Sequence, residues 1–555
     1  MDENRKYICH KPPAWNPDYL AWGAIIVIIV LAAAVRYHLL EVPLERDEGE
    51  YAYAGQLILK GIPPYKYAYN MKMPGIYAAY SAILLAFGQT HAGVHLGLLV
   101  INAATVVLIF LLGRRLFDPL TGVMAGAAFA ALSLGGHVQG MMTHAEHFVI
   151  LFSLGGALLL LRAAESWRPW TLFLSGLLPG VGFLMKQHGT AFILFSFLYL
   201  MWKLIKRPSL PPKAPAWRLA IFSIGALLPF ALTCLALYLT GVFDRFWFWT
   251  FTYAREYVSL LPLVNGLRIL KAQTLNITGS SPLIWAFTAA GASAILWDRD
   301  ARGRYPFLLL FFLFSFFAVL PGLYFRGHYF ILMLPASALL FGAAMGSIRR
   351  LFSRLDRPAL KTAPLFLAAA SVGLSLYNER EILFIASPDE VSRIIYGAYG
   401  PTPFPESIEI ARYIKGHSKE NDRIAVLGSE PQIYFYSNRP SATGYIYTYP
   451  MMEAHRYALK MQEEMIRDIE SERPVFLVYV NIPRSWHAGK PAERLIFDWL
   501  ERYIPEHYEA AGIADIISKD HTDYIWGDEA ERRVPSSKYW VGVYRRKDML
   551  NRGRP

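Results

Sequence analysis

Residues 76–88 read IYAAYSAILLAFG, and whether this stretch crosses a membrane decides the topology of the chain. A transmembrane helix needs about 20 apolar residues, so this stretch is too short to cross alone. We therefore interpret it as an interfacial or re-entrant segment. If it were counted as a crossing, the orientation of everything after it would be inverted.

Eleven other apolar stretches are long enough to span a bilayer, or nearly so. None of them contains Lys, Arg, Asp or Glu, as expected where an unpaired charge costs about 3 kcal/mol or more. The chain is 54% hydrophobic and only 18% charged, which excludes a disordered or collagen-like chain and an ordinary cytosolic enzyme. The composition predicts an α-helical polytopic membrane protein. The stretches are residues 20–35, 93–113, 119–134, 147–161, 170–185, 189–202, 219–240, 282–297, 306–322, 329–347 and 362–377.

The net charge of +12 lies in the membrane half of the chain. Residues 1–377 carry 31 Lys and Arg against 16 Asp and Glu, whereas residues 378–555 carry 24 against 27. This location argues against nucleic acid as a partner. With eleven spans and an inward N-terminus, 20 of the 31 basic residues lie on the cytosolic side, as the positive-inside rule expects. We predict a multi-pass protein of the plasma or inner membrane, with loops 36–75 and 241–281 facing outward.

The tail, residues 378–555, follows the multi-span domain of residues 1–377 and also faces outward. Its apolar runs shorten to strand length and alternate with amphipathic helices. This pattern predicts an extracytoplasmic α/β domain, which is large enough to hold a core of its own. The predicted strands are residues 423–428, 474–480 and 540–545, and the predicted helices are residues 406–415, ended by Gly416, and 451–470.

The first outward loop carries the densest group of acids, in ERDEGEYAYAGQLILKGIPPY, residues 45–65. Residues 48–60 predict an amphipathic helix on the outer surface, ended by glycine and proline. Asp47 and Glu50 have the spacing of a capping box, so stabilisation of the helix start would explain them without any chemistry. The alternative, favoured for Asp47 and Glu48, is a general base with a pKa raised by burial.

Further charged groups recur in the first outward loop and at the outer ends of other spans. Folded together, they would set carboxylates opposite cations at a water–lipid boundary, which suits holding a lipid phosphate while a base activates a hydroxyl. Snorkelling alone would explain Lys186 and Arg326, and an ordinary loop histidine would explain His188 and His328. The groups are Lys72 in NMKMPG, Glu146 in MMTHAEHF, Lys186 and His188 in MKQHG, and Arg326, His328 and Tyr329 in YFRGHYF.

Together these motifs resemble the C-type (GT-C) glycosyltransferases of the protein O-mannosyltransferase and lipid A aminoarabinose transferase kind. The resemblance covers residues 20–350. It implies a multi-span helical core with surface helices in the first external loop. It also implies inverting transfer of a sugar from a polyprenyl-phosphate carrier to an acceptor hydroxyl, or a phosphate group, on a protein, lipid or glycan.

The resemblance assigns a role to each candidate residue. Asp47 would be the acceptor base with Glu48 beside it, and Glu146 would be the second acid of the site. Lys72 and His188 would contact substrate. The donor phosphate would be surrounded by Lys186, Arg326, His328 and Tyr329.

No cofactor is required by this interpretation, although a divalent cation between Asp47 and Glu146 is compatible with it. The alternative function is a multi-span transporter or lipid flippase, which predicts ionisable groups near the bilayer midplane, and the apolar runs lack them. A non-catalytic assembly or sensor protein acting through its tail is the third candidate. We interpret the aromatic stretch at residues 242–262 as a membrane-interface belt, with sugar stacking or acceptor guidance as the alternative.

Overall fold

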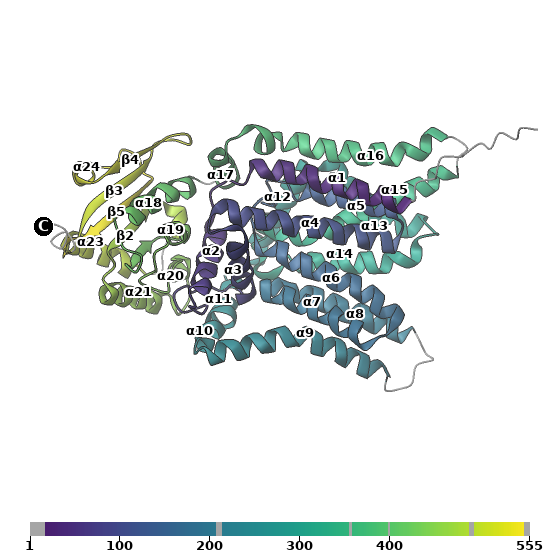
Figure 1. Cartoon of the computed structure of the whole chain (residues 1–555), viewed down its shortest axis with the longest axis horizontal. Coiled ribbons are helices and arrows are strands. Elements are labelled where there is room, and N and C mark those ends of the chain that lie inside the picture. Colours follow the sequence, from purple (N-terminus) through teal and green to yellow (C-terminus); the bar gives the residue numbers. More distant parts are fainter. Residues whose placement is uncertain (1–16, 207–213, 355–357, 398–399, 488–492, 549–555) are drawn as a thin grey trace, which may run out of the picture.

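The computed structural model describes residues 17–206, 214–354, 358–397, 400–487 and 493–548. Figure 1 shows an elongated molecule in which a bundle of roughly parallel helices has a smaller sheet-containing part at one end. We call this smaller part, residues 404–548, the C-terminal region. The bundle ends with α16 at Asn378, and all strands of the described residues lie in the C-terminal region.

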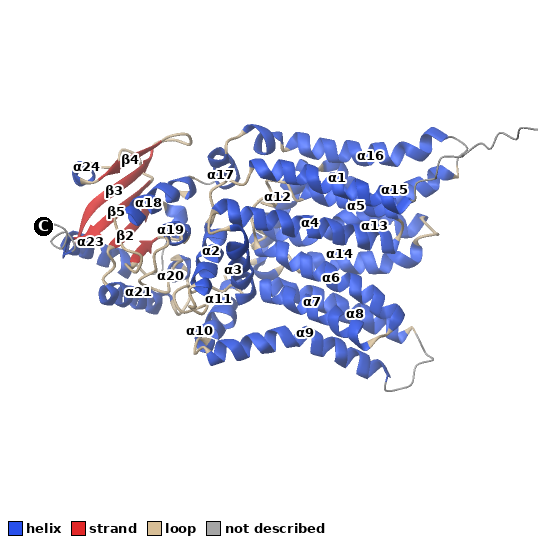
Figure 2. Ribbon diagram, viewed as in Figure 1, coloured by secondary structure: helices blue, strands red, loops and turns tan. Residues whose placement is uncertain are grey.

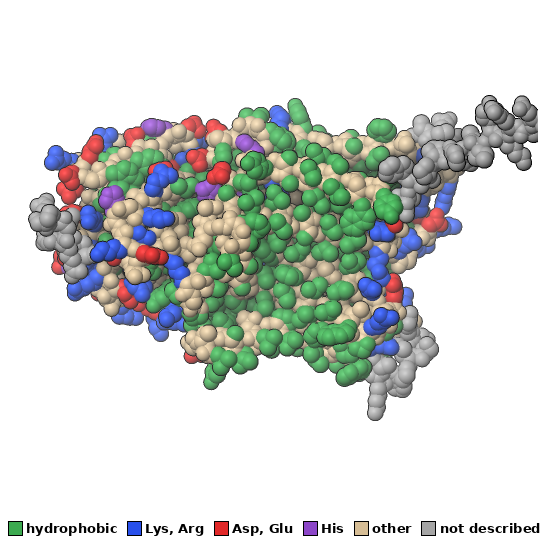
Figure 3. All heavy atoms as spheres, in the orientation of Figure 1, with side chains coloured by type: hydrophobic (Ala, Val, Ile, Leu, Met, Phe, Trp, Pro, Cys, Tyr) green, Lys and Arg blue, Asp and Glu red, His purple; other side chains and the backbone are tan. Residues whose placement is uncertain are grey.

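The helical bundle contains the eleven predicted apolar runs, each of which lies mainly within one helix. Hydrophobic side chains cover much of the face of the bundle that Figure 3 shows, as expected for a lipid-facing surface. The helices are α1 (Pro17–His38), α4 (His91–Leu116), α5 (Pro119–Leu132), α6 (Ala145–Ser166), α7 (Pro169–Met185), α8 (Thr190–Ile205), α9 (Ala214–Leu239), α13 (Pro282–Trp297), α14 (Tyr305–Phe317), α15 (Leu334–Ser353) and α16 (Pro358–Asn378).

Helix length supports fewer spans than the eleven predicted. Within the described residues, seven helices are long and apolar enough to cross a membrane. An eighth span is counted if α12 (Leu263–Ser280) and α13, which meet at a bend of 107°, form one broken span. Helices α5 and α7 are apolar but shorter than the length required. The count of eleven therefore stays a prediction.

Two helices from the first outward loop lie across the end of the bundle (Figure 1). The stretch that decided the topology forms α3 (Pro74–Phe87), which is too short to span, as expected. The acidic stretch forms α2 (Arg46–Leu59), which begins two residues earlier than predicted. Its capping box consists of Glu45 and Glu48, so the predicted pairing of Asp47 with Glu50 is wrong.

Helix α2 is buried rather than exposed on an outer surface. Every residue from Glu48 to Leu57 is buried, including Glu48 and Glu50. The physical reason is that α2 lies between the bundle and the C-terminal region, which covers its second face (Figure 1). The prediction of a surface amphipathic helix is therefore corrected.

The second outward loop also packs against the C-terminal region. Its helices are α10 (Phe243–Trp247), the π-helix η2 (Phe248–Tyr253) and α11 (Ala254–Val258). Trp249, Tyr253 and Tyr257 are buried in one cluster with Tyr445 and other residues of the C-terminal region. The interpretation of these aromatics as a membrane-interface belt is therefore wrong for these three side chains.

The C-terminal region contains a five-stranded mixed sheet with helices beside it (Figure 2). The strand order is β1-β2-β5-β3-β4, in which β1 and β2 are parallel and the other pairs are antiparallel. The three predicted strands are confirmed as β1, β2 and β5, whereas β3 and β4 were not predicted. The strands are β1 (Ile424–Leu427), β2 (Phe476–Asn481), β3 (Tyr508–Ile516), β4 (Thr522–Trp526) and β5 (Trp540–Arg546).

The helices of the C-terminal region agree partly with the prediction. Helix α18 (Phe404–Gly416) ends at Gly416 as expected. The predicted helix over residues 451–470 is interrupted, because α20 (Tyr449–Met452) ends before α21 (Ala458–Glu472) begins. The other helices are α19 (Gln432–Ser437), α22 (Pro483–Trp486), α23 (Leu495–His507) and α24 (Asp528–Arg532), and α17 (Pro388–Tyr396) precedes the region.

Candidate active site

A cavity of about 1290 Å³ lies between the end of the bundle and the C-terminal region. The bundle side contributes Asp47, Arg326 and His328, and the C-terminal region contributes Tyr447 and Arg484 among others. Of the predicted catalytic acids, only Asp47 lines the cavity. The cavity is therefore the place where Asp47 can meet a substrate.

Both carboxylate oxygens of Asp47 are held by hydrogen bonds. Lys72 Nζ donates to Oδ2 at 2.8 Å, and the Tyr447 hydroxyl donates to Oδ1 at 3.0 Å. Burial raises the pKa of Asp47, but the charge and hydrogen bond of Lys72, together with the charges of His144 and Lys186, outweigh burial and hold the pKa well below its usual range. Asp47 is therefore ionised at neutral pH, and its orientation is fixed.

Glu48 points away from the cavity, because consecutive residues of a helix lie about 100° apart around its axis. It is fully buried, accepts a hydrogen bond from the backbone N–H of Thr143 at 2.5 Å, and lies 3.1 Å from His95 Nε2. It also closes the capping box with Glu45. This geometry gives Glu48 a role in anchoring α2, and we do not assign chemistry to it.

A second acid and lysine pair lies at the outer end of α6. Lys186 Nζ donates to Glu146 Oε1 at 2.5 Å, and both side chains are buried. The ammonium also lies 4.3 Å from the centre of the Tyr329 ring, which gives it a cation–π contact. Glu146 Oε2 is buried and has no hydrogen-bond partner among the described residues.

The remaining predicted residues surround this second pair. His328 Nε2 lies 4.0 Å from Glu146 Oε1, and the ring of His188 packs against Tyr329 with centroids 4.8 Å apart. Arg326 donates to the Tyr257 hydroxyl at 3.3 Å, and its side chain is exposed to the cavity. The structure thus brings the predicted residues together, with Glu48 facing away, while their roles stay predictions.

His144 joins the two groups, and the sequence analysis missed it. Its ring stacks on His328 with centroids 4.2 Å apart. Asp47, His144 and His328 each place a side-chain ligand atom within 4.8 Å of the others, which is the spacing of a metal site. His144 is buried, and neither ring nitrogen has a hydrogen-bond partner among the described residues. Its position two residues before Glu146 was the available signal.

These three residues fit a divalent cation better than the predicted pair of Asp47 and Glu146. The ligand atoms of these three residues lie within 4.8 Å of one another, and within the described residues neither ring nitrogen of His144 has a hydrogen-bond partner, although Nδ1 lies 3.8 Å from Glu45 Oε1. A cation at Asp47 would compete with Lys72 and Tyr447, because each oxygen of Asp47 already accepts a hydrogen bond. The protein's own lysines therefore compete with a metal for this site.

Glu50 has a structural environment that predicts a pH dependence of stability. Asn70 Nδ2 and the Tyr77 hydroxyl donate to its two oxygens at 2.7 and 2.5 Å, and burial raises its pKa to about 8. The folded protein therefore binds a proton that the unfolded chain, with an ordinary pKa of 4.5, releases above that pH. The contribution of Glu50 to the free energy of unfolding is fully present below pH 4.5 and is lost as the pH rises through about 8.

We expect thermal unfolding of the detergent-solubilised protein to occur at lower temperature at pH 8.5 than at pH 6, both chosen to bracket the pKa of about 8. Glu50→Gln should reduce this dependence, because glutamine stays neutral at both values. An equal pH dependence in the variant and the wild type would show that Glu50 does not hold the proton.

Comparison with known proteins gives a partial match to one family. Residues 71–236 match the model of a family described as dolichyl-phosphate-mannose-protein mannosyltransferase. That range includes Lys72, Glu146, Lys186 and His188 but not Asp47. A comparison with curated proteins gives no match.

Three solved structures share the fold over most of the chain. ArnT from Cupriavidus metallidurans bound to undecaprenyl phosphate is 15% identical, with a TM-score of 0.54, and the match covers 94% of this chain and 98% of that one. Oligosaccharyltransferase AglB from Archaeoglobus fulgidus, in complex with an inhibitory peptide and a dolichol-phosphate, is 12% identical, with a TM-score of 0.54. The match covers 94% of this chain and 76% of that one. The Archaeoglobus fulgidus oligosaccharyltransferase in complex with Zn and sulfate is 14% identical, with a TM-score of 0.54. The match covers 90% of this chain and 72% of that one.

The fold is therefore that of a GT-C glycosyltransferase, a multi-span helical membrane core with helices of the first outward loop at one end. Within this class, the chain is similar to proteins of the protein O-mannosyltransferase and ArnT kind. The resemblance inferred from the sequence motifs is confirmed.

Proposed function

We propose that the protein transfers a sugar from a polyprenyl-phosphate carrier to an acceptor in the cavity at Asp47. The observation that carries this proposal is a pair of acid–lysine contacts at one end of the bundle: Asp47 with Lys72, which is partly buried, and Glu146 with Lys186, which is buried. His328 lies next to both acids. The undecaprenyl phosphate and dolichol-phosphate bound to two proteins of the same fold support a lipid-phosphate carrier.

The cations and Asp47 act on different steps of the proposed reaction. The bond between the anomeric carbon and the carrier phosphate oxygen breaks, and Lys72, Lys186 and Arg326 neutralise the charge that grows on the departing phosphate. The acceptor oxygen attacks the opposite face of the anomeric carbon and forms the new glycosidic bond, which inverts the configuration. Asp47 accepts the proton that the acceptor hydroxyl loses.

The ion pair with Lys72 makes Asp47 a weak base until the donor binds. A phosphate beside Lys72 competes with Asp47 for the ammonium, so the pKa of the carboxylate rises when the donor is in place. Burial then raises the pKa further, because it disfavours the charged form. The base is thus active mainly in the donor complex, which limits proton abstraction from water when no sugar is available.

The distribution of charge supports an outward-facing site. Lys and Arg gather at the end of the bundle opposite the C-terminal region (Figure 3), where α4 ends with Arg114 and Arg115 and α15 ends near Arg350. The positive-inside rule assigns that end to the cytosol. The cavity and the tail, residues 378–555, then face the outside of a plasma or inner membrane, and residues 1–377 form the membrane domain.

Metal removal is expected to leave the activity nearly unchanged. The positive charges that the phosphate requires are supplied by Lys72, Lys186 and Arg326. The Lys72 ammonium also pairs with the Asp47 carboxylate that a metal ion would bind. Treatment of the purified enzyme with a chelator should change the initial rate by less than about two-fold. A rate lost on chelation and regained with a divalent cation would instead assign a metal to Asp47, His144 and His328.

Transfer can be separated from transport in proteoliposomes that contain a fluorescent polyprenyl-phosphate sugar. A glycosyltransferase releases free polyprenyl phosphate and forms a glycosylated acceptor, whereas a flippase moves the lipid between leaflets with its sugar–phosphate bond intact. We expect cleavage in the leaflet that the cavity faces. Translocation without cleavage would support the transporter and overturn the proposal.

A further inference from the structure

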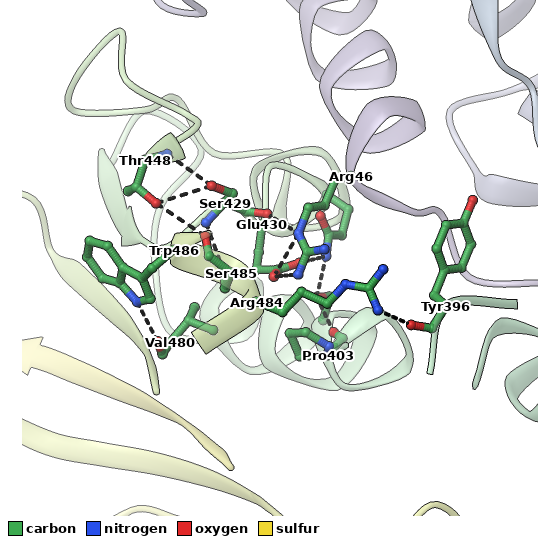
Figure 4. Close-up of polar contacts among 12 residues, drawn as sticks. Arg46, Tyr396, Pro403, Ser429, Glu430, Thr448, Val480, Arg484, Ser485 and Trp486 are labelled. Carbon is green, nitrogen blue, oxygen red and sulfur yellow. Dashed lines mark hydrogen bonds and ion pairs between the residues drawn. The ribbon is translucent and has the colours of Figure 1, made fainter. Parts of the chain in front are cut away.

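The helix that carries Asp47 is clamped by the C-terminal region. Arg46, one residue before Asp47, pairs with Glu430 at 2.6 Å and donates to the Ser429 carbonyl at 2.8 Å, as Figure 4 shows. Both charged side chains are almost completely buried. A buried and hydrogen-bonded ion pair of this kind is costly to break by removing one partner, so the contact fixes the start of α2 against the C-terminal region.

Close backbone contacts extend this clamp along α2. A Cβ atom at Gly49 would lie 2.7 Å from the backbone nitrogen of Gln432, so only glycine allows α2 to approach α19 this closely. The backbone N–H of Ser441 donates to the Tyr53 hydroxyl at 2.8 Å. The helical bundle and the C-terminal region therefore pack together around α2.

The segment that carries Tyr447 is held from the other side by the ends of two parallel strands. Thr448 donates from its backbone to Ser429 Oγ at 3.0 Å and from its hydroxyl to the Ser485 carbonyl at 3.3 Å (Figure 4). Ser429 lies two residues after β1, and Ser485 lies in α22, the helix that follows β2, so both lie beyond the carboxyl ends of the strands, where open α/β sheets place their binding residues. This edge of the sheet faces α2 and the cavity.

We propose that Tyr447 is the positioning residue for Asp47, which makes the C-terminal region a component of the active site. Its hydroxyl donates to Asp47 Oδ1 at 3.0 Å across 400 residues of sequence. When the donor phosphate draws Lys72 away from Oδ2, this hydrogen bond is the contact that keeps the carboxylate directed at the acceptor. The proposal rests on the proposed function of Asp47 as the acceptor base.

Tyr447→Phe tests this role, and Tyr445→Phe is its matched control. Tyr445 is also buried and donates to an acid, Glu464 at 3.0 Å, but it does not line the cavity. We expect Tyr447→Phe to lower kcat about 10- to 100-fold with little change in the KM of the donor. The acid limb of its pH–rate profile should move to higher pH, because the carboxylate loses a hydrogen bond that favours its charged form. Tyr445→Phe should leave kcat and the pH–rate profile unchanged.

A second readout does not depend on activity. Carbodiimides react with protonated carboxyl groups, and mass spectrometry can locate the adduct on the peptide that contains Asp47. Because loss of the hydrogen bond raises the pKa of Asp47, Tyr447→Phe should be labelled there faster than the wild type at mildly acidic pH, whereas Tyr445→Phe should not.

The two readouts separate the possible failures. Equal kinetics, pH profiles and labelling in the two variants would overturn the role of Tyr447 while leaving the transferase assignment intact. Faster labelling of Asp47 in Tyr447→Phe, in a protein that cleaves no lipid-linked sugar, would confirm the contact but overturn the proposed function on which it rests.

Discussion

Asp47→Asn is expected to lower sugar transfer by about 10²- to 10⁴-fold, the range that a general base contributes. Asparagine has nearly the same shape and can still accept a hydrogen bond from Lys72 or Tyr447, so the cavity should keep its geometry. It cannot take a proton from the acceptor. The measurement is the initial rate of carrier release by the purified variant, together with its thermal unfolding in the same detergent.

Asp118→Asn is the matched control for this experiment. Asp118 caps α5 and pairs with Arg349 at 2.7 Å, and neither residue lines the cavity. Asparagine also caps helices well, so this variant should fold and retain activity. Wild-type rates in Asp47→Asn would remove Asp47 from the mechanism.

Lys186→Met is expected to impair both stability and activity. Methionine fills much of the volume of the lysine stem, but Glu146 is left as a buried carboxylate without its cation. Removal of one partner of a buried ion pair typically costs about 3–5 kcal/mol. We therefore expect lower thermal stability and a large loss of donor consumption.

The double variant Lys186→Met with Glu146→Gln separates these two effects. Neutralising Glu146 removes the uncompensated charge, so stability should recover towards that of the wild type. Activity should stay low, because the cation beside the donor phosphate is still missing. Recovery of activity together with stability would show that Lys186 acts only as a partner of Glu146.

Much of the fold follows from short-range patterns in the sequence. Apolar runs and the short stretch at residues 76–88 are visible because lipid solvent and helix length impose simple rules. Strands β3 and β4 were missed because their residues do not form an uninterrupted apolar run in the sequence. Glu509 and Asp515 break the apolar run of β3, which also has a register shift between Ala510 and Gly512, and β4 is only partly buried along its length.

The candidate site was predictable only where its residues share local motifs. Lys72, Glu146 and Lys186 stand in such motifs, and so does His144, although it was overlooked. The burial of α2 and the contact of Tyr447 with Asp47 depend on how the C-terminal region packs against the bundle. Tyr447 and Asp47 are 400 residues apart, and local sequence patterns do not predict a contact over that separation. Arg46 and Glu430 likewise appear as ordinary surface charges until they are paired.

We propose cleavage of a lipid-linked sugar in the cavity at Asp47. It is tested most directly by incubating the purified protein with a panel of polyprenyl-phosphate sugars and measuring free polyprenyl phosphate by mass spectrometry. We predict release from at least one donor by the wild type and by Asp118→Asn, with release by Asp47→Asn near background. Release from no donor, or equal release by Asp47→Asn, would contradict the claim.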